Sequence, residues 1–340
     1  MTRRFRKLAA AVVAVLAAAS VPGAVRAQTV PRAQSVYEYV VTATQGSFEE
    51  VSASIQGAVS EAGWRLLATV DSGVPEGCSF RSRVFVLFEE SYGRELMAAN
   101  RKTAPFALVD RVNLFEDERG VHLALVNPHS INRTILLEDH KYQALSSRHL
   151  EALRALLGAA VPGKASRTQY GPKRKKGYIG RTMGVMAGGP FDGKIEDEAV
   201  VGGPAWQDVA RKVRDGLVKK GETWGMHLVY ELELPEHETV IFGSTGTPMD
   251  SKSFDIVKEG SDGSRKRLKC PGLAHAGAYP IEVVVARDGE SVRVRVVNIM
   301  YRMKMYFEDA GKWAFMMNMT MPGSIQSELR RQITTALGTR

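Results

Sequence analysis

One amphipathic helix pattern occurs twice in this chain. In each copy, hydrophobic residues recur every four positions, which places them on one face of a helix. The first copy begins with Ser47 and Glu50, the two residues of a capping box, and the second copy lies 158 positions later. The hydrophobic residues are Val51, Ile55 and Val59 in the first copy and Val209, Val213 and Leu217 in the second. This repetition predicts two versions of one small domain.

Alternating hydrophobic and polar positions predict strands around these helices. Segments 112–115 and 121–123 alternate on either side of a charged turn at 117–120, which indicates a β-hairpin. The strand at 121–127 is echoed at 292–298, an offset of 171, so the second half holds about 13 more residues before this strand. Further helices are expected at 94–100, 141–157 and 325–337, and further strands at 36–43, 65–70, 83–88, 226–232, 239–242 and 281–286.

Together these elements predict an α+β fold made of two repeated domains. Each domain is expected to be an antiparallel sheet with two amphipathic helices on one face. The first copy spans 34–162 and the second, more divergent copy spans 203–340. Segment 163–202 is rich in glycine and holds a basic run at 173–176, which is typical of a solvated linker. An alternative for the basic run is a site for an acidic partner or a lipid head group.

The first 27 residues have the pattern of an export signal. Basic residues precede an apolar run at 8–19, and small residues at 25 and 27 flank Arg26. Loss of the signal removes five basic residues from the formal charge of +9 and leaves +4, which gives no basis for nucleic-acid binding. No later segment reaches the length of about 20 apolar residues that a membrane helix needs. We therefore expect a periplasmic or secreted protein without a transmembrane segment.

The two cysteines, Cys78 and Cys270, lie one in each predicted copy. In an oxidising compartment an even number of cysteines favours a disulfide, which here would bridge the two domains. The alternative is a pair of unbonded, partly buried thiols. Neither cysteine has a neighbouring cysteine or histidine that would indicate redox or nucleophilic chemistry.

Four segments of the first half carry a resemblance to a known family. They are Ser47-Phe48-Glu49-Glu50, Val84-Phe85-Val86-Leu87-Phe88, Val112-Asn113-Leu114-Phe115-Glu116-Asp117 and Val126-Asn127-Pro128. Residues 34–160 thereby resemble the family called domain of unknown function 302, and residues 200–340 resemble it less, since Asn298 is followed by Ile299 rather than proline. The resemblance implies a β-α-β(4)-α arrangement, grouped with TATA-binding-protein-like folds, in two tandem copies. It implies no catalytic residue.

Seven of the 13 methionines fall between 300 and 321. Alternation around a turn at 308–312 predicts an inserted, methionine-rich hairpin at 299–321 with one apolar face. Its candidate ligand-binding residues are Tyr301, Met303, Met305, Phe307, Trp313, Phe315, Met317 and Met319. Such a face suits ordinary packing or an apolar binding surface. A third interpretation is a Cu(I) or Ag(I) site at Met303, Met305, Met317 and Met319, because thioethers are soft ligands.

Motifs of known enzyme classes are absent from the sequence. There is no HExxH zinc pattern and no GxSxG nucleophile elbow, so the residues indicate no enzyme class and no catalytic residue. The leading prediction is a non-enzymatic, exported pseudo-dimer that binds a small apolar ligand or a protein partner and has no cofactor. The alternative prediction is a periplasmic soft-metal protein with copper as its cofactor.

Overall fold

The computed structural model describes residues 33–174, 177–180, 188–203, 205–258 and 265–339, and the predicted signal at 1–27 lies outside them. The elements up to residue 160 are β1 (Gln34–Thr42), α1 (Phe48–Glu61), β2 (Arg65–Asp71), β3 (Ser82–Phe88), α2 (Glu90–Ala99), β4 (Asp110–Asp117), β5 (Gly120–Val126), α3 (Pro128–Ile135) and α4 (Lys141–Ala160). Four short strands follow: β6 (Lys164–Ala165), β7 (Gln169–Arg174), β8 (Tyr178–Ile179) and β9 (Gly189–Pro190).

The later elements begin at residue 195. They are β10 (Ile195–Gly202), α5 (Trp206–Val218), β11 (His227–Leu234), β12 (Thr239–Thr245), α6 (Thr247–Val257), β13 (Ile281–Asp288), β14 (Ser291–Val297), α7 (Ile299–Phe307), α8 (Lys312–Met317) and α9 (Thr320–Leu337). Short 3-10 helices include η5 (Arg265–Arg267), η6 (Pro271–Ala278) and η7 (Glu308–Ala310). The α+β class predicted from the sequence is therefore confirmed.

Helix α1 forms as its sequence predicts. The Ser47 hydroxyl accepts a hydrogen bond from the Glu50 N–H at 3.3 Å, and the Glu50 carboxylate accepts one from the Ser47 N–H at 2.7 Å. This capping box satisfies amide groups that the first turn of a helix leaves without partners. The buried face of α1 packs with α4 against one face of the first sheet, in a core that includes Ile55, Leu114 and Leu153.

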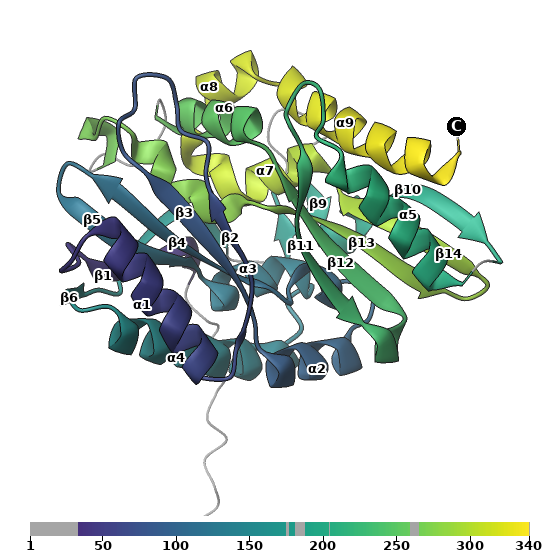
Figure 1. Cartoon of the computed structure of the whole chain (residues 1–340), viewed down its shortest axis with the longest axis horizontal. Coiled ribbons are helices and arrows are strands. Elements are labelled where there is room, and N and C mark those ends of the chain that lie inside the picture. The colour runs from purple at the N-terminus through teal and green to yellow at the C-terminus, as the bar shows by residue number, and fades with distance from the viewer. Residues whose placement is uncertain (1–32, 175–176, 181–187, 204, 259–264, 340) are drawn as a thin grey trace, which may run out of the picture. The chain divides into compact units, whose positions relative to one another are not determined.

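Both sheets are antiparallel. The first has the strand order β2-β3-β4-β5-β1-β6, with β7 also paired to β1, and the second has the order β10-β14-β13-β12-β11. In Figure 1, α1 and α4 lie against the first sheet, α5 and α9 lie beside the second, and β2 and β11 run side by side where the sheets meet. The predicted hairpin at 112–123 is β4 and β5, in which Leu114 pairs with Leu123.

The interpretation of 163–202 as a solvated linker is wrong for much of the segment. Strand β7 pairs with β1, and Tyr170 and Arg174 within it are each 4% exposed. Strand β10 is the edge strand of the second sheet and pairs with β14, so the second sheet begins before residue 203. Strands β7 and β10 use their backbone groups in sheet hydrogen bonds. The spacing of glycines and basic residues in the sequence gives no sign of this pairing.

The predicted hairpin at 299–321 is also wrong, because this segment forms α7, η7, α8 and the start of α9. The Asn298 side chain accepts a hydrogen bond from the Tyr301 N–H at 3.0 Å and caps α7. In the predicted hairpin Arg302 and Lys304 fall on the face opposite the apolar one, but in the structure both are 3% exposed. A helix buried on all sides has no polar face, so its sequence can imitate the alternation of a strand.

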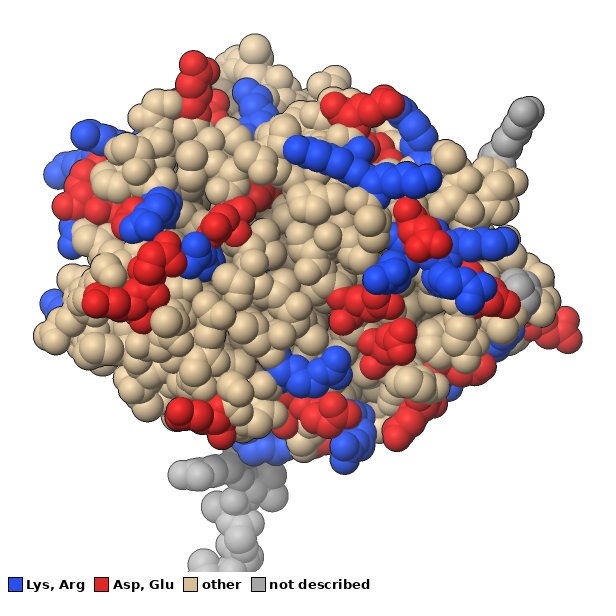
Figure 2. All heavy atoms as spheres, in the orientation of Figure 1, with Lys and Arg blue, Asp and Glu red and all other residues tan. Residues whose placement is uncertain are grey.

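Charged side chains of both signs are interspersed over the face drawn in Figure 2. The middle of that face, over β2 and β11, carries few of them. No helix among the described residues is long and apolar enough to cross a membrane.

Candidate functional site

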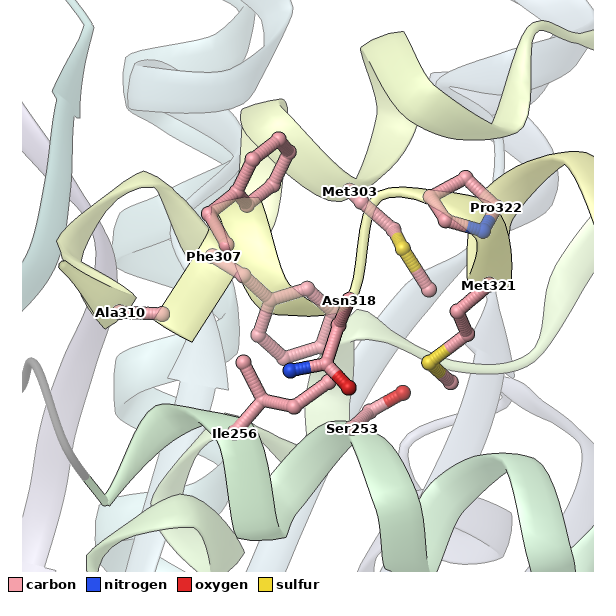
Figure 3. A pocket seen from close by; sticks show the side chains of 9 residues that line it. Ser253, Ile256, Met303, Phe307, Ala310, Asn318, Met321 and Pro322 are labelled. Carbon is pink, nitrogen blue, oxygen red and sulfur yellow. The ribbon is translucent and has the colours of Figure 1, made fainter. Parts of the chain in front are cut away.

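An apolar pocket lies between the last four helices of the chain. Its lining contains no charged side chain, and its only polar side chains are a serine and an asparagine. The lining residues are Ser253 and Ile256 of α6, Met303 and Phe307 of α7, Ala310, Phe315 of α8, Asn318, Met321 and Pro322. In Figure 3 the side chains of Met303, Met321 and Asn318 point into one space above Ser253 and Ile256. The cavity has a volume of about 20 Å³, so a larger ligand has to displace the methionines.

Methionine side chains make such displacement easy. They are unbranched, with three rotatable bonds and a polarizable sulfur, and they adapt to irregular apolar shapes. Met303 and Met321 are 8% and 5% exposed, so both are held inside the fold rather than in solvent. The arrangement favours binding of an uncharged apolar group, because no carboxylate, amine, guanidinium or imidazole lines the pocket.

Helix α8 covers this pocket and exposes its other side to solvent. Phe315 lies on the pocket side. Trp313, Met316 and Met317 are 75%, 46% and 80% exposed, and Met319, just after the helix, is 42% exposed. A short helix with apolar side chains on both sides is unusual for a surface of a soluble domain.

The residues predicted as one binding face are divided by the helices. Met303, Phe307 and Phe315 line the pocket. Tyr301 is buried elsewhere and donates a hydrogen bond to the Gly189 carbonyl at 3.1 Å, and Met305 is 1% exposed outside the pocket lining. The remaining three, Trp313, Met317 and Met319, lie on the surface.

The four methionines predicted as a copper site do not share one face. Met303 and Met305 are two positions apart on α7, so they point about 200° apart around the helix. Met317 is 80% exposed on α8. Among the described residues, no group of three or more histidine, cysteine, aspartate or glutamate side chains is placed to hold a metal ion. The site was predicted from the number of soft thioether ligands in 300–321, and it stays a prediction, although α7 and α8 do not bring these four side chains to one face.

Several pocket residues were missed by the sequence analysis. Ser253 and Ile256 belong to α6, a helix that no hydrophobic period had predicted. A signal for α6 exists, because Pro248 stands in the first turn, where proline favours a helix start. Met321 was counted in the methionine cluster but was placed on the hairpin rather than at the start of α9.

A buried acid lies one turn before the pocket on α6. Asp250 is 2% exposed and accepts hydrogen bonds from the Thr245 hydroxyl at 2.7 Å and from the Gly73 N–H at 3.2 Å. Burial raises the pKa of Asp250 to about 7, although both hydrogen bonds oppose the change. Gly73 has to be glycine for this contact, because a Cβ there would stand 2.1 Å from the Thr247 carbonyl oxygen.

Asp250 is expected to make stability depend on pH. Its pKa is higher in the folded chain than in the unfolded chain, so the folded state holds the proton more tightly and loses stability as pH rises from about 4 to about 7. The variant Asp250→Asn, which loses one acceptor at every pH, should therefore be more stable than the natural chain at pH 8 by about 2 kcal/mol and less stable at pH 4 by a similar amount. Urea unfolding at both pH values measures this, and an equal difference at both would contradict it.

Buried ion pairs join the two sheets. Glu282 of β13 pairs with Arg111 of β4 and, at 3.3 Å, with Arg302 of α7. All three side chains are at most 5% exposed. Arg111 also donates to the Tyr306 hydroxyl and to the Pro280 carbonyl. The contacts of Arg111 connect residues that are more than 160 positions apart.

A disulfide joins the same two halves at another point. Cys78 lies between β2 and β3, Cys270 directly precedes η6, and their sulfur atoms are bonded across a Cα–Cα distance of 6.1 Å. Together with the hydrogen bond from Gly73 to Asp250, it ties the β2–β3 connection to the first turn of α6 and to the segment that follows α6.

No family model matches this chain, and no curated protein matches it. Among solved structures, the chain is similar to the crystal structure of an uncharacterized conserved protein, DUF302, from Bacillus stearothermophilus. The two are 11% identical, with a TM-score of 0.32, and the match covers 36% of this chain and 95% of that chain. The name of that protein assigns it no activity.

Proposed function

We propose that this protein binds a small apolar ligand in the pocket between α6, α7, α8 and α9 and that it is not an enzyme. The observation that carries the proposal is a lining of nine residues without a charged side chain, to which α8 contributes Phe315 and the flanking helices α7 and α9 contribute the adaptable Met303 and Met321. Ligand sites in proteins are mostly apolar with a few polar groups that fix orientation. Here the Asn318 amide and the Ser253 hydroxyl are the polar groups.

We infer that the chain consists of two tandem copies of one folding unit, which form an internal pseudo-dimer. The supporting features recur at matching places. Strands β1 and β10 each carry an irregularity at the same register, between Tyr39 and Val41 and between Asp197 and Ala199. The caps of α3 and α7 are also alike: Asn127 accepts from the Ser130 N–H and Asn298 accepts from the Tyr301 N–H. Five strands of each sheet follow the same order.

If α3 and α7 are equivalent helices of the two copies, the apolar pocket belongs to the second copy alone. Superposing the two helix caps pairs Asn132 of α3 with Met303 of α7. Asn132 donates to the Tyr92 hydroxyl at 2.5 Å and to the Ser146 hydroxyl at 3.1 Å, so the matching place in the first copy is polar and internally bonded. Helix α8 has no counterpart between α3 and α4. Both differences between the copies concern residues of the pocket. They therefore support the proposal that ligand binding was added to the second copy.

We further propose that residues 1–27 direct export, so that the mature chain acts in the periplasm or outside the cell. The basic and apolar pattern of the segment supports this. Amino-terminal sequencing of the mature protein would start at Gln28 if the proposal holds, and a mature chain that starts at Met1 would contradict it.

A matched pair of variants on α8 tests the pocket. Phe315→Glu places a carboxylate in the lining, whereas Met316→Glu places the same charge on the neighbouring exposed position. The neutral probe N-phenyl-1-naphthylamine should bind the natural chain, and Phe315→Glu should weaken binding at least about tenfold, because burial of an unpaired charge is very unfavourable. Met316→Glu should change the affinity less than about twofold.

Fluorescence titration of the probe measures both affinities, and circular dichroism checks that both variants are folded. The proposal that this pocket binds an apolar ligand would be contradicted by equal affinities of the two folded variants for the probe. It would also be contradicted if the natural chain did not bind the probe. If the purified protein retained a folded protein partner and no small ligand, the alternative that the methionine-rich region binds a protein would be favoured.

A further inference from the structure

The outer side of α8 exposes more apolar surface than the pocket requires. Four large apolar side chains lie within seven positions, Trp313, Met316, Met317 and Met319, each at least 42% exposed. Elsewhere in the described part of the chain, large exposed hydrophobic residues are scattered, as at Val200 and Val218. Single residues of this kind are normal on a surface, but a cluster marks a place where another apolar phase binds.

Basic residues stand next to this cluster. The guanidinium group of Arg265 in η5 lies 2.9 Å from the carboxylate of Asp309 in η7, and η7 ends two residues before α8 begins. This contact places η5 beside the start of α8. The next two residues of η5, Lys266 and Arg267, are exposed, and no described acidic side chain forms an ion pair with either.

The acidic residues of η7 already have partners. Asp309 pairs with Arg265 and with His275 at 2.9 Å. Glu308 lies 3.1 Å from Arg174 and 3.7 Å from Lys304. Among the described residues of η5 and η7, the exposed charges without an ion pair to a described residue, Lys266 and Arg267, are therefore positive.

We propose that the outer side of α8, together with Lys266 and Arg267, docks on the surface of an anionic lipid bilayer. Tryptophan favours the membrane interface, where its ring is apolar and its N–H remains in contact with water. An apolar helix side next to basic residues is the pattern of interfacial lipid binding, in which acyl contacts and anionic head groups both contribute. A protein partner would also cover apolar residues, but the open basic pair selects a negatively charged surface.

With the outer side of α8 on the bilayer, the pocket would lie close to the lipid. The residues facing the pocket and the residues facing solvent alternate along α8, as in Phe315 and Met316. A bilayer that covers the outer side is then separated from the pocket by the thickness of one helix. The proposal goes beyond ligand binding and does not depend on it, because the outer side of α8 is not part of the lining.

Vesicle binding by the full mature chain tests the proposal. Co-sedimentation should show binding to vesicles that contain phosphatidylglycerol and weaker binding to vesicles of phosphatidylcholine alone. The emission of Trp313 should shift to the blue on binding, and brominated lipids should quench it. The double variant Trp313→Ser with Met317→Ser should lose affinity by at least about tenfold. The control, Val200→Ser with Val218→Ser, removes two apolar residues outside α8 that are 50% and 57% exposed, and it should bind like the natural chain.

Charge reversal gives an independent measurement. Lys266→Glu with Arg267→Glu should weaken binding to the anionic vesicles by roughly fivefold for each position and leave the affinity for the naphthylamine probe unchanged. The proposal is overturned if the natural chain binds neither kind of vesicle, if Trp313 shows no shift in bound protein, or if the α8 variant binds as well as its control. Probe binding that survives any of these results leaves the pocket proposal intact.

Discussion

Replacement of Glu282 by glutamine is expected to destabilise the protein by about 3 to 5 kcal/mol. The Glu282 carboxylate lies between Arg111 and Arg302, and all three side chains are almost fully buried. Glutamine keeps the shape of the side chain but removes the negative charge. Two guanidinium groups would then remain in the interior without a counter-ion, and the loss of one partner from a buried ion pair has a large effect for that reason.

A surface ion pair provides the control for this measurement. Glu231 of β11 lies 2.9 Å from Arg214 of α5, and the Arg214 side chain is half exposed. Glu231→Gln should change the free energy of unfolding by less than about 1 kcal/mol, because solvent screens an exposed pair. Urea unfolding followed by circular dichroism compares the variants. If Glu282→Gln lost no more stability than Glu231→Gln, the buried cluster would not hold the two sheets together.

Removal of the disulfide is expected to have a similarly large effect. Cys78 and Cys270 are 192 positions apart, so the bond closes a very long loop and restricts the unfolded chain strongly. We expect the double variant Cys78→Ser with Cys270→Ser to lose about 3 to 5 kcal/mol. The magnitude depends on how much structure the unfolded chain keeps.

Reduction of the natural chain is the second arm of this experiment. A phosphine reductant should lower its midpoint of urea unfolding to that of the double serine variant and should not change the variant. An unaltered midpoint after complete reduction, verified by thiol titration, would show that the ion pairs and the apolar core join the halves without help from the bond.

The sequence predicted correctly those elements that are stabilised by contacts between residues close together along the chain. The capping box of Ser47 and Glu50 and the four-residue spacing of Val51, Ile55 and Val59 specify α1 within 13 positions. The turn at 117–120 specifies the β4–β5 hairpin in the same way. Such signals work because the groups that satisfy each other are close along the chain.

Helix α7 was mistaken for a strand because its environment is not local. Arg302 is satisfied by Glu282 of β13, and Lys304 is close to Glu308 and donates to the Gly180 carbonyl. With those partners present, polar residues can be buried on a helix, and the solvent-facing side that the alternation implied does not exist. The Asn298 cap was the one local signal for a helix start here.

The pocket itself could be predicted only in part. The methionine and aromatic residues at 303, 307 and 315 were singled out from composition, and they do line it. Ser253 and Ile256 come from α6, about 50 positions earlier in the chain. No spacing in a single sequence reports that α6 packs beside α7 and α8, since that contact depends on how the second sheet orders its strands.

By itself the sequence determined the α+β class and the positions of the most regular helices and strands, because these follow from periodicity, capping and turns. The tertiary structure alone decided that segment 169–174 pairs with β1, that Arg111 and Arg302 share Glu282, and that the methionine-rich segment folds as helices around a pocket. The physical reason is burial. Desolvation changes which partner a polar or apolar side chain needs, and those partners come from distant parts of the chain.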